Sequence, residues 1–142
     1  MKPVTHFEIP FDDAERAKQF YSTVFNWKIG AVPDMQYHFV CTTESDEKTG
    51  MPLKPGAING GMYKRCDVSS KHPVPVVMVP NTKEYVDKVT AAGGSLVGNI
   101  HQVGNMGIYA QVKDSEGNII GLWETLKGEE CDIPERQELA NQ

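Results

Sequence analysis

The residues best suited to chemistry stand near the N-terminus, in the segment VTHFEI at residues 4–9. The alternation of a β-strand places His6 and Glu8 on one face of this segment and Phe7 and Ile9 on the other. A histidine with a carboxylate neighbour titrates near physiological pH and is suited to act as a general base. Imidazole nitrogen and carboxylate oxygen also bind divalent metals, and the i, i+2 spacing permits both to reach one ion.

Other patterns in the chain offer less chemistry. The glycine-rich segment GAINGG at 56–61 lacks the Lys-Ser/Thr of a phosphate-binding loop, and it is better explained as a strand that allows close backbone approach. No Gly-x-Ser-x-Gly nucleophile elbow occurs. Cys41, Cys66 and Cys131 are scattered and form no Cys-x-x-Cys pair, which is typical of a reducing cytosol. Each is expected to be a small structural residue and not a nucleophile.

The elements that must position His6 and Glu8 follow from the apolar pattern of the first half. Asp12 or Asp13 is the expected N-cap of a helix. Phe20, Phe25 and Trp27 continue the apolar pattern and are expected in the core. The predicted elements are a strand at 4–9, a helix at 13–25, strands at 27–29, 37–43 and 57–63, and a polar loop at 44–56.

The second half repeats this order of elements. Asn81 or Thr82 caps its helix, and a shift of 81 − 13 = 68 residues places Asp13 over Asn81 and His6 over Val74. Both halves therefore have the order β-α-β-β-β. The predicted elements are a strand at 74–79, a helix at 82–92, a short strand at 96–97, and strands at 107–113 and 119–124, followed by a polar tail at 126–142.

Composition limits the classes of function. The 142 residues suffice for one domain, and the net charge of −5 without a Lys/Arg cluster argues against nucleic-acid binding. The longest apolar stretch, 74–80, is far shorter than the ~20 residues of a membrane-spanning helix. The N-terminal segment has no apolar region followed by a cleavage site, so we expect a cytoplasmic protein.

Two segments together resemble the glyoxalase/bleomycin-resistance/extradiol-dioxygenase superfamily, the vicinal oxygen chelate fold. They are THFEIPFDDAERAKQFYSTVFNWKI at 5–29 and VGNMGIYAQVKDSEGNIIGLWE at 103–124. The resemblance implies an α+β fold in which two βαβββ modules, 1–63 and 74–125, form one domain, 1–125, with a curved, cup-shaped mixed sheet. It also implies a homodimer, because pairing between chains completes the cup in this family.

The resemblance implies a metal site in the cup only where the ligands are present. Metal-dependent members take one ligand from the first strand and one from the last strand of each module. His6 matches the first of these positions, whereas Val74, Gly60 (or Gly61 in a shifted register) and Gly121 fall at the other three and cannot bind a metal through their side chains. The resemblance therefore indicates a branch without a metal cofactor; a displaced divalent metal site would use His6, Glu8 and His72.

The resemblance thus predicts a pocket in the cup. Glycines leave space, Trp123 provides a surface for stacking, and His6 orients the ligand by hydrogen bonding. We expect the protein to bind a small planar or aromatic molecule without a metal. The alternative is a metal-dependent lyase, isomerase or dioxygenase with displaced ligands. The candidate pocket residues are His6, Glu8, His38, Gly60, Tyr109, Gly121 and Trp123.

Overall fold

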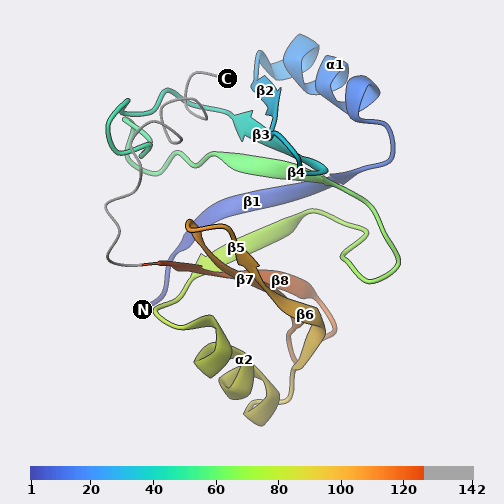
Figure 1. Cartoon of the computed structure of the whole chain (residues 1–142), viewed down its shortest axis with the longest axis vertical. Coiled ribbons are helices and arrows are strands. Elements are labelled where there is room, and N and C mark those ends of the chain that lie inside the picture. The colour runs from blue at the N-terminus through green and yellow to red at the C-terminus, as the bar shows by residue number, and fades with distance from the viewer. Residues whose placement is uncertain (127–142) are drawn as a thin grey trace.

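The computed structural model describes residues 1–126, in which two similar modules share one eight-stranded mixed sheet (Figure 1). The strand order is β2-β3-β4-β1-β5-β8-β7-β6. The predicted α+β fold with two βαβββ modules and a curved sheet is confirmed. The predicted polar tail, 126–142, lies outside the described residues except for Leu126. No helix within residues 1–126 is long and apolar enough to cross a membrane.

The first module occupies one end of the molecule. Asp13 accepts a hydrogen bond from the backbone nitrogen of Arg16 and so caps α1, and Asn26 ends the helix in the left-handed conformation. Strand β4 pairs with β1 in parallel and with β3 antiparallel. The elements are β1 (Val4–Phe11), α1 (Ala14–Phe25), β2 (Lys28–Ala31), β3 (Tyr37–Cys41) and β4 (Gly60–Lys64).

The second module repeats the pattern at the other end. Asn81 caps α2 through the backbone nitrogen of Glu84, at the position that the 68-residue shift assigns to Asp13. The strand predicted at 96–97 is longer than expected and includes a register shift between Val97 and His101. The elements are β5 (Val74–Met78), α2 (Thr82–Ala91), β6 (Ser95–Val103), β7 (Gly107–Lys113) and β8 (Ile119–Thr125).

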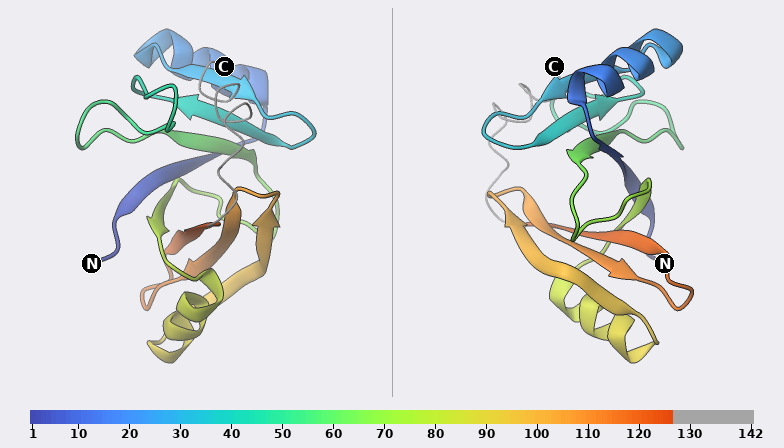
Figure 2. Two further views of the ribbon diagram at one scale, coloured as in Figure 1. Left: turned by 60° about the vertical axis from the view of Figure 1, so that its left-hand side comes forward. Right: turned by 90° about the vertical axis from the view of Figure 1, so that its right-hand side faces the viewer.

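Strands β1 and β5 join the two modules within one chain. They pair antiparallel, with His6 opposite Val76 and Glu8 opposite Val74. Figure 2 shows the helices at opposite ends of the molecule, outside the curved sheet. The strand that carries His6 and Glu8 therefore lies at the centre of the sheet.

Each helix covers an apolar cluster on the convex face. Under α2 the cluster contains the buried residues Val79, Val86, Ala110, Val112 and Leu122. Under α1 it contains Phe11, Ile29, Val40 and Met62. Apart from Val86 of α2 and Val79, which directly follows β5, these buried residues occupy strand positions opposite in phase to His6 and Glu8.

Of the three aromatic residues predicted in the core around α1, only Trp27 packs against it. Trp27 packs against the cluster under α1 and stacks on Tyr21, with ring centroids 5.1 Å apart. Phe20 and Phe25, predicted in the core, are 55% and 54% exposed. The reason is that none of the 12 residues of α1 is fully buried, so the helix lies on the sheet with only part of its apolar surface covered.

Candidate ligand-binding site on the concave face

Strand register fixes which side chains share the concave face with His6 and Glu8. Glu8 lies opposite Gly61 of β4, and His6 lies opposite Val76, which in turn lies beside Gly121 of β8. Side chains of directly paired residues point to the same face of a sheet. The same pairing adds an aromatic set to this face: Tyr37, Phe39, Tyr63, Tyr109 and Trp123.

Two tyrosines fill the space that the glycines leave. A Cβ atom at Gly61 would lie 1.7 Å from the hydroxyl of Tyr37, and one at Gly121 would lie 3.0 Å from the hydroxyl of Tyr109. The sequence predicted that the glycines leave empty space in the cup. That prediction is wrong for Gly61 and Gly121. They make room for tyrosine side chains from the neighbouring strands, whose hydroxyl groups reach the polar residues of β1.

His6 is bound by the first tyrosine. Its Nε2 lies 3.0 Å from the Tyr37 hydroxyl. Burial lowers the pKa of His6 to about 4, because the charged imidazolium loses its hydration. His6 is consequently neutral at pH 7 and offers a ligand a hydrogen bond and not a charge, which corrects the expectation that it titrates near neutrality.

Glu8 is bound by the second tyrosine. The Tyr109 hydroxyl donates a hydrogen bond to Oε1 of Glu8, and the Glu8 residue is 6% exposed. Burial raises the pKa of Glu8, while the hydroxyl groups of Tyr109 and Tyr37 oppose that rise by stabilising the carboxylate. Burial and the nearby Glu8 charge also raise the pKa of Tyr109. Proton transfer from tyrosine to ligand is thereby disfavoured, so its hydroxyl acts as a hydrogen-bond donor.

The segment between the modules closes one side of this network. Gln111 donates from Nε2 to the Tyr109 hydroxyl at 3.1 Å and accepts from the backbone nitrogen of Ser70 at 2.9 Å. Tyr63 donates to the carbonyl oxygen of Ser70 at 2.6 Å. Ser70 is 3% exposed, so at this residue the connector packs against the site.

Trp123 lies where its phase predicted, beside Tyr109 on the concave face. Its Nε1 donates to the Thr125 hydroxyl at 3.1 Å, and its ring covers Gly107, where a Cβ would lie 2.3 Å from the indole. Like Tyr37, Tyr63 and Tyr109, Trp123 is half-buried. The concave face therefore presents partly exposed aromatic rings around a buried polar pair.

Three candidate residues lie elsewhere. His38 is on the convex face, with its ring 5.4 Å from that of Phe11, because its strand is apolar on both faces and the pattern does not fix the phase. Gly60 also faces the convex side, where a Cβ would meet Phe7, so Gly61 is the cup-facing glycine. His72 is exposed in the connector.

Sequence reasoning named Tyr109, the partner of Glu8, but missed Tyr37, the partner of His6, and the residues that support the site around them. Tyr37, Tyr63 and Gln111 provide hydrogen-bonding groups on the concave face, together with the backbone of Ser70. Alternation from Tyr109 predicts the orientation of Gln111, and alternation within YHFVC offers Tyr37 as one of two choices. The connector gave no signal because its conformation depends on Gln111, 41 residues away.

The residues present do not fit a metal centre of the kind that the resemblance describes. Among residues 1–126, no group of three or more His, Cys, Asp or Glu is arranged to hold a metal ion. In particular, His72 does not join His6 and Glu8 in such a group. The strand positions paired around His6 and Glu8 carry Gly61, Val74, Val76 and Gly121. None of these side chains can donate an electron pair to a metal ion.

Comparisons with known proteins bear on the first module and on the fold. Residues 4–43 match the family model of the bleomycin resistance protein-like N-terminal domain. No curated protein matches the sequence. The family match in the first module and the fold of both modules confirm the resemblance to the glyoxalase/bleomycin-resistance/dioxygenase superfamily.

Solved structures of the same fold are distant in sequence. Methylmalonyl-CoA epimerase from Mycobacterium tuberculosis superposes with a TM-score of 0.54 at 15% identity, covering 87% of each chain. A hypothetical protein from Bacillus halodurans C-125 superposes with a TM-score of 0.57 at 11% identity, covering 89% of this chain and 96% of that one. A glyoxalase/bleomycin resistance protein/dioxygenase superfamily member from Vibrio splendidus 12B01 gives 0.52 at 9% identity, over 87% and 99%. These likenesses establish the fold.

Proposed function

We propose that the protein binds a small planar or aromatic organic molecule against the concave face of its sheet, without a metal ion. The observation that carries this proposal is the set of half-buried aromatic side chains on that face, Tyr37, Phe39, Tyr63, Tyr109 and Trp123. Partly exposed aromatic rings gain free energy when a flat apolar molecule covers them, and offset stacking adds to this gain.

The polar pair would set the orientation of the ligand. His6 is neutral at pH 7 and uses Nε2 toward Tyr37, so Nδ1 is the ring atom left for a ligand. Glu8 is buried and already receives the Tyr109 hydroxyl. Few polar groups on an apolar floor are what small-molecule sites use to select one orientation.

The absence of side-chain donors at Gly61, Val76 and Gly121 supports binding without a metal. Tyrosine rings occupy the space over both glycines, so a metal would have to displace Tyr37 and Tyr109 and would still lack donors there.

Fluorescence titration tests this proposal. Trp27→Phe leaves Trp123 as the single indole, and Trp27 lies on the convex side with Tyr21. A panel of aromatic metabolites is titrated into this variant after treatment with chelator. We expect saturable quenching, and His6→Ala should weaken binding by about tenfold, the loss expected for one buried hydrogen bond.

His38→Ala is the matched control because His38 lies on the opposite face of the same sheet. It should leave the dissociation constant unchanged within about twofold, because its ring packs against Phe11 on the convex side and does not reach the concave face. Binding that requires added Ni²⁺, Zn²⁺ or Fe²⁺, with stoichiometric metal found by elemental analysis, would contradict the proposal and favour a metal-dependent enzyme.

We also propose that the protein is a twofold homodimer of the cytoplasm. The edge strands β2 and β6 each pair with a single strand, so their outer edges have no strand partner within residues 1–126, and a second copy would cover such an edge. The free thiols Cys41 and Cys66 suit a reducing compartment. Sedimentation velocity should give twice the chain mass of 15.7 kDa, and a species of one chain mass at all concentrations would contradict the dimer.

A further inference from the structure

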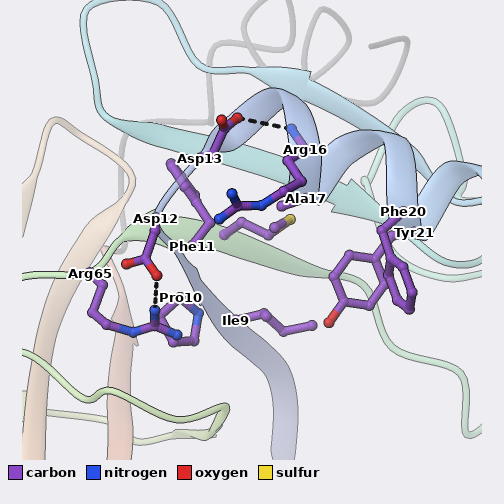
Figure 3. A pocket seen from close by; sticks show the side chains of 11 residues that line it. Ile9, Pro10, Phe11, Asp12, Asp13, Arg16, Ala17, Phe20, Tyr21 and Arg65 are labelled. Atoms are coloured by element: carbon purple, nitrogen blue, oxygen red, sulfur yellow. Dashed lines mark hydrogen bonds and ion pairs between the residues drawn. The ribbon is translucent and has the colours of Figure 1, made fainter.

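A cavity lies on the convex side, away from the concave site. It measures about 350 Å³ and lies between the end of β1 and the first turns of α1 (Figure 3). This volume is within the range of small-molecule sites. Its lining contains Ile9, Pro10, Phe11, Asp12, Asp13, Arg16, Ala17, Phe20, Tyr21, Met62 and Arg65.

One part of the cavity is apolar. Phe11 and Met62 belong to the buried cluster under α1, and Ile9, Ala17 and Tyr21 pack against it. Phe20 contributes a ring that is 55% exposed and meets Tyr21 edge-on, with centroids 5.1 Å apart. An apolar molecule lying on Phe20 would cover this ring, which the protein itself leaves exposed.

The other part carries two guanidinium groups and two carboxylates, those of Arg16, Arg65, Asp12 and Asp13. Both lining carboxylates are engaged: Asp12 accepts from Arg65 Nη1 at 2.6 Å, and Asp13 accepts from the Arg16 backbone nitrogen at 3.0 Å. The Nε of Arg65 is buried and has no hydrogen-bond partner among the described residues. The Arg16 guanidinium and the Tyr21 hydroxyl likewise have none within residues 1–126.

These two parts meet in one space. Figure 3 shows Arg65 beside Asp12 and Arg16 extending from α1 near Asp13 on one side, and Phe20 and Tyr21 on the other with the tyrosine hydroxyl turned toward Ile9. An unpartnered buried donor in a folded protein calls for an acceptor. Guanidinium groups pair with carboxylates in a planar geometry that adds strength and specificity.

We propose that this cavity binds a small organic anion with an aromatic or alkyl body, its carboxylate held by Arg16 and Arg65 and its body against Phe20 and Ile9. The site is independent of the concave face, from which the sheet separates it. This cavity would select an anion, whereas the neutral His6 of the concave face offers a ligand no charge.

Titration with 2-naphthoate, followed by amide chemical shifts of the ¹⁵N-labelled full chain, tests this site. We expect shifts confined to residues 9–21 and 62–65, with a dissociation constant of about 1 mM or tighter for a ligand of this size. The neutral 2-naphthamide should bind about tenfold more weakly or worse, because it offers no charge to the guanidinium groups.

Variants separate the contributions. Arg16→Gln and Arg65→Lys should each weaken 2-naphthoate by about tenfold, and the latter keeps a cation beside Asp12 while removing Nε. Lys18→Gln is the control because Lys18 is an exposed cation of the same helix that does not line the cavity. It should change binding less than about twofold.

The proposal would be overturned if about 10 mM 2-naphthoate, a concentration set by the affinity of small ligands, caused no amide shifts. Equal binding of 2-naphthoate and 2-naphthamide would also overturn it. So would equal losses of affinity in Arg16→Gln and Lys18→Gln. Shifts restricted to Tyr109 and Trp123 would assign the anion to the concave face and also overturn it. Because the two sites lie on opposite faces, failure here leaves the fluorescence test of the concave site unaffected.

Discussion

The ionisation of His6 is set by its surroundings and not by its carboxylate neighbour. The imidazole is buried and hydrogen-bonded to Tyr37, and burial lowers its pKa from 6.5 to about 4. Sequence reasoning weighed Glu8 as a charge partner, which would raise the pKa of His6. Desolvation wins because the carboxylate is itself buried and is bound by Tyr109.

This difference predicts how stability depends on pH. The unfolded chain protonates His6 near pH 6.5, whereas the folded protein does so only near pH 4. Lowering the pH through this window therefore favours the unfolded state, by up to about 3 kcal/mol for this group. Glu8 acts in the opposite sense because its pKa is raised. The free energy of unfolding of the wild type should thus fall relative to that of His6→Gln between pH 6.5 and 4, and parallel profiles would contradict the prediction.

Substitution by alanine should have different effects on stability at the adjacent residues Gly60 and Gly61. In Gly60→Ala the new Cβ would lie 2.5 Å from the backbone oxygen of Phe7, which cannot move independently. In Gly61→Ala it would meet the far end of the Tyr37 side chain, which can rotate away. Gly60→Ala should cost about 1–3 kcal/mol of stability, an overpacking effect, and Gly61→Ala less.

Urea denaturation measures both stabilities. The imidazole resonances of His6 provide the second readout, because rotation of Tyr37 breaks its hydrogen bond to Nε2. Gly61→Ala should therefore shift those resonances, whereas Gly60→Ala acts on the convex side. Equal stability losses with unchanged His6 resonances would be inconsistent with the close contacts described.

At the scale of elements, the caps of the two helices were predictable and correspond across the repeat. Asp13 and Asn81 each accept from the backbone nitrogen three residues later, at 3.0 and 2.9 Å. Asp13→Ala and Asn81→Ala should each lower the free energy of unfolding by about 1 kcal/mol. Asp87→Ala, an exposed change within α2, is the control. Thermal and urea denaturation check the prediction, and equal effects of all three substitutions would contradict a capping role.

Sequence reasoning predicted strands at β6 and β3 but missed the length of the first and the phase of the second, and both misses have physical causes. Strand β6 is a sheet edge with mostly exposed side chains and a register shift near Gly98, so it shows no regular alternation. Strand β3 has apolar residues on both faces, with Phe39 concave and Val40 fully buried on the convex side, so the phase of His38 was undetermined. By contrast, His6, Glu8 and Trp123 lie in clear alternation, and their faces were predicted correctly.

At the scale of the whole molecule, the repeat explains why the site is central. Each module contributes its first strand to the middle of the sheet, where β1 and β5 pair. Glycines of both modules then lie near the polar pair, Gly61 beside Glu8 and Gly121 beside Val76. The sequence revealed the loss of metal donors at these positions. It did not reveal that Tyr37 of β3 and Tyr109 of β7 fill the space over Gly61 and Gly121. These contacts join residues 24 and 12 positions apart in different strands, which alternation within one strand does not predict.

The central claim is that an aromatic molecule binds this concave face without a metal. Its most direct test is amide and indole chemical-shift mapping of the metal-stripped, ¹⁵N-labelled protein with the tightest ligand of the fluorescence panel. The account predicts that shifts centre on Tyr37, Tyr109, Gln111 and the Trp123 indole, and that added Zn²⁺ or Ni²⁺ leaves them unchanged. Shifts that appear only with metal, or that centre on α1 instead, would contradict it.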